Sequence, residues 1–402
     1  MQNILRKINN LSAKINRQVV LMELCGTHTE AVARHGIKKL LPKNIKLLSG
    51  PGCPVCVTDQ RDINAVIALA LEGIPIACYG DALRVPGTLI VPNTKYQIPN
   101  TGFGLDKARE LGAEVTEVYS AEDALKLQKI KPNLVFFGLG FETTTPMTAS
   151  AIKRGLTVYS SHKAFVPAMK ALLNTPSLKI DGFINPGHVS TIIGINPYKK
   201  LKYTPSVIAR SHQATKQSQT YCAKEEIAAL PELAPSKIEG VARNDNAIPQ
   251  VIAGFEASDV IIAIYMLLKQ IAENRAEVEN EYTRLVRPEG NPKARELINE
   301  VFEIGDAYWR GIGKIPNSGF EIRKKYAEFD AKLKYKEIFN SLNTKYQILN
   351  TGFGCICGAI LRGLKEPKDC KLFNKKCTPA NPIGACMVSS EGACEIEAKF
   401  KN

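Results

Sequence analysis

The stretch VVLMELCGTHTE at residues 19–30 is the part of the sequence that best indicates the fold. Its first six residues form an apolar run with β-branched side chains, which is typical of a buried strand. The residues that follow, EAVARHGIKKLL at 30–41, have the periodicity of a helix, and IKLLS at 45–49 predicts a second strand. A strand, a helix and a strand joined by short loops make a βαβ unit, which implies a parallel sheet covered by helices.

The same alternation continues through the first two-thirds of the chain. Residues 256–330 look mainly helical, and the tail from about 350 is rich in Cys, Gly and Pro, so loops are expected there. The pattern predicts an α/β protein with mostly parallel sheets. Further strands are predicted at 74–80, 113–120, 134–140, 156–161 and 181–187, and further helices at 61–73 and at 121–129, where Ser120 is the expected N-cap.

Length and charge narrow the class of protein. A chain of 402 residues is too long for one core and suits two or three domains. The formal charge is +14, but Lys and Arg are spread along the chain without a dense basic run. This pattern favours acidic protein partners over nucleic acid. No apolar run approaches a membrane span, and the basic N-terminus lacks the apolar core of an export signal, so a cytoplasmic protein is expected.

Eleven cysteines are the unusual feature of the composition. The cytoplasm keeps thiols reduced, so this number indicates metal ligation or redox chemistry rather than structural disulfides. Three cysteines lie early and six lie in the last fifty residues, while Cys78 and Cys222 stand alone. Cys222 is not expected to be functional.

Two cysteine motifs follow predicted strands, where ligands bind in open α/β sheets. In CGTHTE (25–30), Cys25 and His28 lie on a turn into a helix, whose N-terminus is expected to lower the pKa of the thiol. A small buried cysteine beside a hydrogen-bonded histidine is the structural alternative. In GPGCPVCVT (50–58), the spacing of Cys53 and Cys56 suits one metal ion or a dithiol–disulfide pair. The alternative is a proline-stiffened turn with two packed cysteines.

Two further loops follow strands. GFETTTP (140–146) offers hydroxyl and amide donors suited to an anion, but it lacks the Gly-Lys-Ser/Thr element of a nucleotide-binding P-loop. Capping threonines are the structural alternative. His188 in NPGHVS (185–190) and His162 also follow strands and favour a lined cleft, although a single histidine is more often structural.

The C-terminal cysteines are the strongest signal. Cys355, Cys370, Cys377 and Cys394 offer four thiolates, which can hold a [4Fe–4S] cluster or a zinc ion. Spacing alone does not separate these two. Two additional cysteines, Cys357 and Cys386, favour redox chemistry, because zinc does not change its oxidation state.

Inserted segments interrupt the pattern. NTKYQIPNTGFG (93–104) recurs almost unchanged as NTKYQILNTGFG (343–354), yet the flanking sequences do not match. A duplicated domain would repeat over tens of residues, so both copies are interpreted as surface insertions. The polar stretch at 203–248 is interpreted in the same way.

Several long motifs occur together in one order: MELCGTHTE (22–30), GPGCPVCVT (50–58), GFETTTPMTA (140–149), NPGHVSTIIG (185–194), VIAGFE (251–256), WRGIG (309–313) and LFNKKCTPANPIGACMVSSEGAC (372–394). In these motifs the chain resembles the HypD family, which helps to build the Fe(CN)2CO centre of [NiFe]-hydrogenases. The resemblance covers about residues 18–398, apart from insertions near 89–104, 203–248 and 343–354.

The resemblance implies two α/β domains around a cleft and a small C-terminal iron–sulfur domain. The corresponding division of this chain is 1–155, 156–330 (with the insertion 203–248) and 331–402. The resemblance also implies a HypC-type chaperone as partner, a HypE-type protein as cyanide donor and the hydrogenase large subunit as the eventual recipient.

Residue roles carry over by motif. Cys25 would be the thiolate on an Fe(II) ion that carries CN and CO, with His28 beside it. Cys53 and Cys56 would form the adjacent redox pair. Cys355, Cys370, Cys377 and Cys394 would hold a [4Fe–4S] cluster, and Cys357 and Cys386 would be the dithiol–disulfide near it.

Two other functions stay open on the residues alone. One is an iron–sulfur thiol–disulfide oxidoreductase acting on protein substrates, which would lack iron at Cys25. The other is a zinc-stabilised binding module, which would contain zinc and show no visible chromophore.

Overall fold

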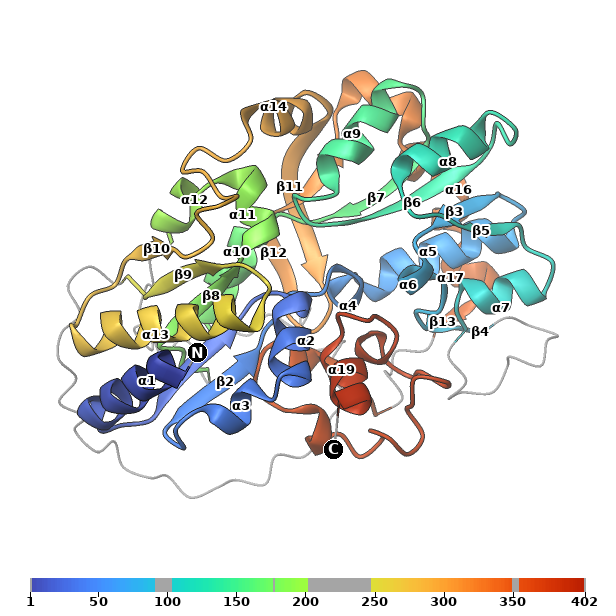
Figure 1. The fold of residues 1–402 in the computed structure, drawn as a ribbon. Coiled ribbons are helices and arrows are strands. Elements are labelled where there is room, and N and C mark those ends of the chain that lie inside the picture. The colour runs from blue at the N-terminus through green and yellow to red at the C-terminus, as the bar shows by residue number, and fades with distance from the viewer. Residues whose placement is uncertain (1, 91–102, 176–177, 202–246, 349–353, 401–402) are drawn as a thin grey trace, which may run out of the picture.

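A computed structural model describes residues 2–90, 103–175, 178–201, 247–348 and 354–400. Two parallel sheets form its frame (Figure 1). The first has the strand order β10-β9-β8-β1-β2 and the second β5-β3-β6-β7. The strands of the first are β1 (Val19–Glu23), β2 (Ile45–Ser49), β8 (Gly182–Pro186), β9 (Gln250–Ala253) and β10 (Val278–Asn280); those of the second are β3 (Ile76–Cys78), β5 (Val115–Glu117), β6 (Val135–Gly140) and β7 (Val158–His162).

The chain leaves the first sheet after β2, builds the whole second sheet, and returns to the first sheet at β8. The predicted α/β class with parallel sheets is therefore confirmed. The boundaries predicted at 155 and 330 stay a prediction about folding units.

Helices cover both faces of the sheets, as parallel sheets require. On β6, Phe136 packs with α8 (Ala121–Gln128) and α9 (Thr145–Lys153), while Phe137 faces the opposite core with α5 (Gln60–Leu71) and α10 (Phe165–Leu173). On the first sheet, α1 (Gln2–Ile15) packs beside α13 (Ala257–Ala272) (Figure 1). Ser120 caps α8 as predicted, because its side chain accepts a hydrogen bond from the amide of Asp123.

Most of the remaining helices and strands are short. They are α2 (Gly26–Arg34), α3 (Ile37–Leu40), α4 (Pro54–Val57), α6 (Gly80–Leu83), β4 (Leu89–Ile90), α7 (Leu105–Glu110), α11 (Gly187–Ile193), α12 (Asn196–Lys199), α14 (Pro292–Val301), β11 (Phe302–Trp309), β12 (Gly313–Ile322), η3 (Lys324–Phe329), α15 (Ala331–Lys334), α16 (Lys336–Asn340), α17 (Leu342–Lys345), β13 (Gln347–Ile348), α18 (Cys357–Leu361), η4 (Pro367–Asp369), η5 (Ala385–Met387) and α19 (Ala393–Phe400).

Two predicted helical stretches need correction. The helix expected at 30–41 is divided into α2 and α3, because Gly36 adopts a left-handed conformation with φ 61°. The mainly helical segment expected at 256–330 holds α13 and α14, but residues 302–322 form the antiparallel hairpin β11–β12. Gly311 and Gly313, with φ 77° and 104°, make its tight turn.

The predicted insertions are only partly visible. Most of 203–248, with Cys222, and the bulk of the first NTKYQ copy lie outside the described residues. The second copy contributes α17 and β13, and β13 pairs with β4. Its Lys345 and Tyr346 both bond to Glu72, at 2.8 and 3.1 Å, so the described half of this copy is fixed to α5's C-terminal end.

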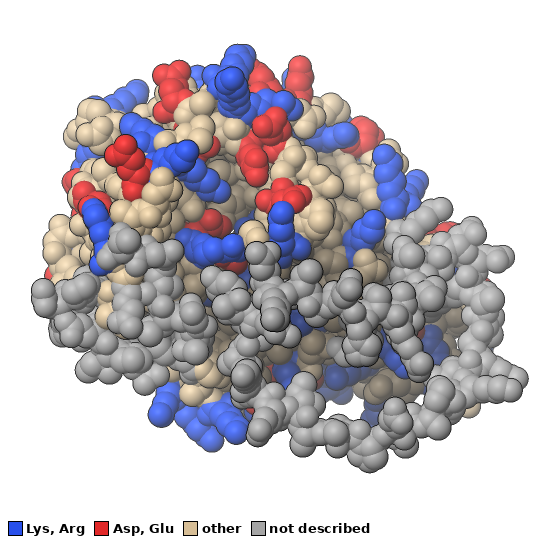
Figure 2. Space-filling view, turned by 180° about the vertical axis from the view of Figure 1, so that it is seen from behind, with Lys and Arg blue, Asp and Glu red and all other residues tan. Residues whose placement is uncertain are grey.

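The C-terminal segment consists mainly of turns, as expected, and packs against α2 and α4 (Figure 1). Within the described ranges no helix is long and apolar enough to cross a membrane. On the face shown in Figure 2, basic and acidic side chains are interspersed over the upper part.

Candidate functional site

A cleft of about 480 Å³ opens where the carboxyl ends of strands from both sheets approach the C-terminal segment. Loops following β3, β5 and β6 line one side. His188, after β8, lines the other side with Ser389 and Glu391. This is the position at which open α/β sheets bind ligands.

Cys25 lies two residues after the end of β1 and is the N-cap residue of α2. Its Sγ lies 3.8 Å from Nδ1 of His188, and its amide donates to Oε2 of Glu23 at 3.1 Å. Burial, with a smaller effect of the Glu391 carboxylate, raises the pKa of Cys25 to about 12. The expectation that the helix N-terminus lowers this pKa is therefore wrong, because desolvation of the thiolate outweighs the helix dipole. The thiol is neutral at pH 7, and a metal ion binding there would displace its proton.

His28 is fully buried in the first turn of α2. Its Nε2 bonds to the carbonyl of Gly254 at 2.9 Å, and its ring packs on Phe255. Burial lowers the pKa of His28 to about 4, so the imidazole is neutral, and its Nδ1 has no hydrogen-bond partner. The imidazole in contact with the Cys25 sulfur belongs to His188, which the sequence singled out only as lining a cleft. Phe255 packs on both rings.

The loop after β2 carries a disulfide between Cys53 and Cys56. Pro54 opens α4, and Cys53 Sγ accepts a hydrogen bond from the amide of Cys56 at 3.1 Å. Gly52 permits the approach of this loop to Cys25, because a Cβ on Gly52 would overlap the Cys25 backbone. The sequence motifs at 25 and 53 are thus brought into direct contact.

Six cysteines line one small apolar cavity in the C-terminal segment: Cys355, Cys357, Cys370, Cys377, Cys386 and Cys394. Cys357 shares sulfur hydrogen bonds with Cys355 and Cys386, which lower the pKa of Cys357 and raise the pKa of its two partners. Among the described residues, no three side chains are already placed to hold one metal ion. The four predicted ligands line the same cavity, so this donor set fits an iron–sulfur cluster.

The chain is similar to known proteins over nearly its whole length. The HypD family model, described as the hydrogenase formation hypA family, matches residues 1–212 and 237–401. The chain belongs to the HypD family. The hydrogenase maturation factor HypD of Azotobacter vinelandii is 41% identical over 395 residues, covering 94% of this chain and 88% of that protein. HypD2 of Bradyrhizobium diazoefficiens is 39% identical over 390 residues, covering 93% and 87%. A putative hydrogenase expression/formation protein of Methanocaldococcus jannaschii is 38% identical over 404 residues, covering 98% and 95%.

In this HypD-family chain the C-terminal segment connects the cysteine groups. Cys56 Sγ lies 3.9 Å from the carbonyl of Ala385, the residue before Cys386 in η5. The hydroxyl of Thr27, two residues after Cys25, donates to Glu391 at 3.2 Å. The cysteine cavity, the Cys53–Cys56 disulfide and Cys25 therefore form one continuous region.

The GFETTTP loop of the HypD-family chain borders the cleft with Thr143 and Thr144. The hydroxyl of Thr145 already donates to the Phe141 carbonyl at 2.7 Å. Glu142 is buried and accepts from the amide of Phe165 at 2.9 Å, and burial raises its pKa to about 7. These groups fix the loop internally.

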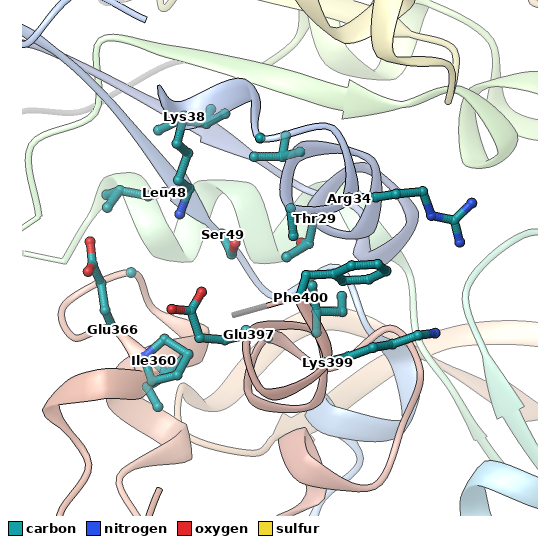
Figure 3. Close-up of a pocket in the computed structure, with 18 of the residues that line it drawn as sticks. Thr29, Arg34, Lys38, Leu48, Ser49, Ile360, Glu366, Glu397, Lys399 and Phe400 are labelled. Atoms are coloured by element: carbon teal, nitrogen blue, oxygen red, sulfur yellow. The ribbon is translucent and has the colours of Figure 1, made fainter. Parts of the chain in front are cut away.

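A second cavity, of about 380 Å³, lies away from the cysteines between α2, α3, β2 and α19. Figure 3 shows Lys38 reaching toward Ser49, with Glu366 and Glu397 on the opposite wall. Thr29 and Ser49 bond to the buried Glu23, so Glu23 separates this cavity from Cys25.

Proposed function

We propose that this protein is a scaffold for assembly of the Fe(CN)2CO centre of a [NiFe]-hydrogenase. The iron is the cargo, bound through the Cys25 thiolate next to His188, which lines the cleft, with His28 nearby. The observation that carries the proposal is the contact of Cys25 with the Cys53–Cys56 loop and, through Ala385, with the six-cysteine cavity. Thiolate is a suitable soft ligand for low-spin iron with cyanide and carbonyl ligands.

The same arrangement supports a coupling of iron binding to redox chemistry at the neighbouring cysteines. Release of cyanide from a partner's thiocyanate consumes two electrons, because R–S–CN becomes R–S⁻ and CN⁻. The Cys53 and Cys56 thiols give up two electrons and two protons when their disulfide forms. A [4Fe–4S] cluster held by Cys355, Cys370, Cys377 and Cys394 would supply single electrons when bound. Cys357 and Cys386 line the same cavity, and Cys386 follows Ala385, which lies against Cys56, so this pair would serve as the intermediate dithiol.

The proposed partners follow from this chemistry. A HypC-type chaperone shares the iron, a HypE-type protein presents the thiocyanate in the cleft, and the hydrogenase large subunit receives the centre indirectly. These steps are proposed for the cytoplasm, without nucleic acid or a membrane. The domains 1–155, 156–330 and 331–402 are the proposed units of this scaffold.

Infrared spectroscopy tests the scaffold function. The protein is purified without oxygen after co-expression with the organism's other maturation proteins. We expect stretching bands of iron-bound CN and CO, which disappear in Cys25→Ala and persist in Cys78→Ala. Cys78 is a matched control, because it is equally buried but lies in β3 of the second sheet. A wild-type protein that contains the cluster and shows no bands would contradict the scaffold function.

A thiol–disulfide oxidoreductase is a second candidate, favoured by the Cys53–Cys56 disulfide. Cys53 is 3% exposed and Cys56 is 0% exposed, which disfavours attack on protein substrates and suits exchange inside the molecule. Metal analysis excludes the zinc-module alternative if iron and a visible chromophore are found.

A further inference from the structure

Arg310 connects the two groups of redox cysteines through its position in the hairpin turn. The turn after β11 reaches the junction of α4 and the C-terminal segment (Figure 1). The amide of Arg310 donates to the Val57 carbonyl at 2.9 Å, and its Nε donates to the Thr58 carbonyl at 3.0 Å. Its Nη1 donates to Oε1 of Gln60 at 2.6 Å. One residue thus holds the chain immediately after Cys56 by three hydrogen bonds.

The other side of the same turn lies against α18. Gly311 approaches Gly358 so closely that a Cβ on either glycine would overlap the other. Gly358 follows Cys357, whose sulfur bonds to Cys386. The hairpin turn therefore fixes the position of the Cys53–Cys56 loop relative to the Cys357–Cys386 pair.

Beyond its bonds to Thr58 and Gln60, the guanidinium keeps one donor group without a partner. Its Nη2 is buried and has no hydrogen-bond partner among the described residues. A buried donor without an acceptor is costly, so Nη2 is the part of this side chain that its contacts with the loop do not explain.

We propose that Arg310 is a positioning residue that aligns the Cys357–Cys386 dithiol with the Cys53–Cys56 disulfide for internal exchange. In this exchange the Cys53–Cys56 bond breaks and a Cys357–Cys386 bond forms, and two protons pass to Cys53 and Cys56. Two electrons move with them, so no external reagent is consumed. The inference rests on the proposed function for its purpose, but its geometry can be tested without iron or partner proteins.

The test traps the approach of the two pairs. In full-length protein carrying Cys53→Ser and Cys357→Ser, the remaining exchange partners are Cys56 and Cys386. Diamide oxidation is quenched with acid at set times, and the Cys56–Cys386 bond is measured by peptide mass spectrometry. We expect this bond to form readily, and Arg310→Gln to slow it about tenfold. Arg323→Gln is the matched control, because Arg323 also bonds to backbone carbonyls, those of Asn299 and Phe302.

Two further variants test whether Arg310 acts by aligning the cysteine pairs, and not merely through its charge or by keeping the protein folded. Gln60→Ala removes the Nη1 acceptor, together with the bonds from Gln60 Nε2 to Asn64 and to the Pro86 carbonyl. We expect it to slow bond formation about threefold with an unchanged circular-dichroism spectrum. Arg310→Lys keeps the charge but loses the fork that binds Thr58 and Gln60, so it should not restore the rate. Full restoration by lysine, or equal rates in all variants, would overturn the proposal. Absence of CN and CO bands with an unchanged trapping pattern would contradict only the scaffold function.

Discussion

Glu142 in the GFETTTP loop should make the protein less stable as the pH rises. Its side chain is 5% exposed, Oε1 accepts from Phe165, and Oε2 has no hydrogen-bond partner. Burial raises the pKa of Glu142 from the ordinary 4.5 to about 7. A tenfold change in an acid constant corresponds to about 1.4 kcal/mol, so this shift corresponds to about 3 kcal/mol.

The direction of this pH dependence follows from proton binding in the folded and unfolded states. Between pH 4.5 and 7 the folded protein binds more protons at Glu142 than the unfolded chain does, so the free energy of unfolding falls as the pH rises. Below pH 4.5 both states are protonated and Glu142 contributes no penalty. Above pH 7 the whole penalty of about 3 kcal/mol is present.

Glu142→Gln removes the ionisation and keeps the oxygen that accepts from Phe165. The free energy of unfolding, from urea titrations, should match the wild type at pH 4.5 and exceed it by about 3 kcal/mol at pH 8. Glu337→Gln serves as the control, because Glu337 is exposed in α16, and it should change the free energy by less than about 0.5 kcal/mol at either pH. A variant that tracks the wild type at both pH values would refute the reasoning.

Two more substitutions test the cysteine region. Gly52→Ala should lower the free energy of unfolding by about 1–3 kcal/mol, because the added methyl group overlaps the Cys25 backbone. The control Gly36→Asn lies at an open left-handed position and should change the free energy of unfolding by less than about 0.5 kcal/mol. Equal effects of the two substitutions in a thermal melt would contradict the close-approach argument. Cys357→Ser should retain the visible absorption of the cluster while abolishing the CN and CO bands of the loaded protein, whereas loss of the absorption would make Cys357 a cluster ligand.

Local pattern accounts for the parts of the fold that were predicted correctly. Strands such as 19–24 and 134–140 are apolar runs bounded by turn residues, and their identity depends on burial of both faces. Strand order depends on contacts between distant segments, so the insertion of β3–β7 between β2 and β8 left no local signal. The hairpin β11–β12 was missed because many of its side chains are exposed, and its two strands support each other rather than a sheet.

In the candidate site, too, local motifs were predictable and long-range contacts were not. Cys25 and the Cys53–Cys56 pair could be found because both motifs follow predicted strands. The contact between Cys25 and His188 joins residues 163 positions apart, and that between Thr27 and Glu391 joins residues 364 positions apart. The effect of burial on the pKa of Cys25 could not be predicted either, because a turn motif does not show which residues cover the thiol. WRGIG was recognised as a motif, but only packing reveals that Arg310 bonds to Val57 and Thr58.

The unmatched stretch at 213–236 is compatible with an intact site, because the chain on either side of it is anchored. Leu201 and Ile248 are both buried in the same core, and Gln250 donates to the Tyr198 carbonyl at 3.2 Å. Since these ends are held together, doubling the length of a flexible segment between them costs only about 0.6 kcal/mol. Tyr198 also bonds to Ser190 at 3.0 Å, which fixes α11. His188 in α11 therefore keeps its place beside Cys25 whatever the length of the segment that follows Leu201.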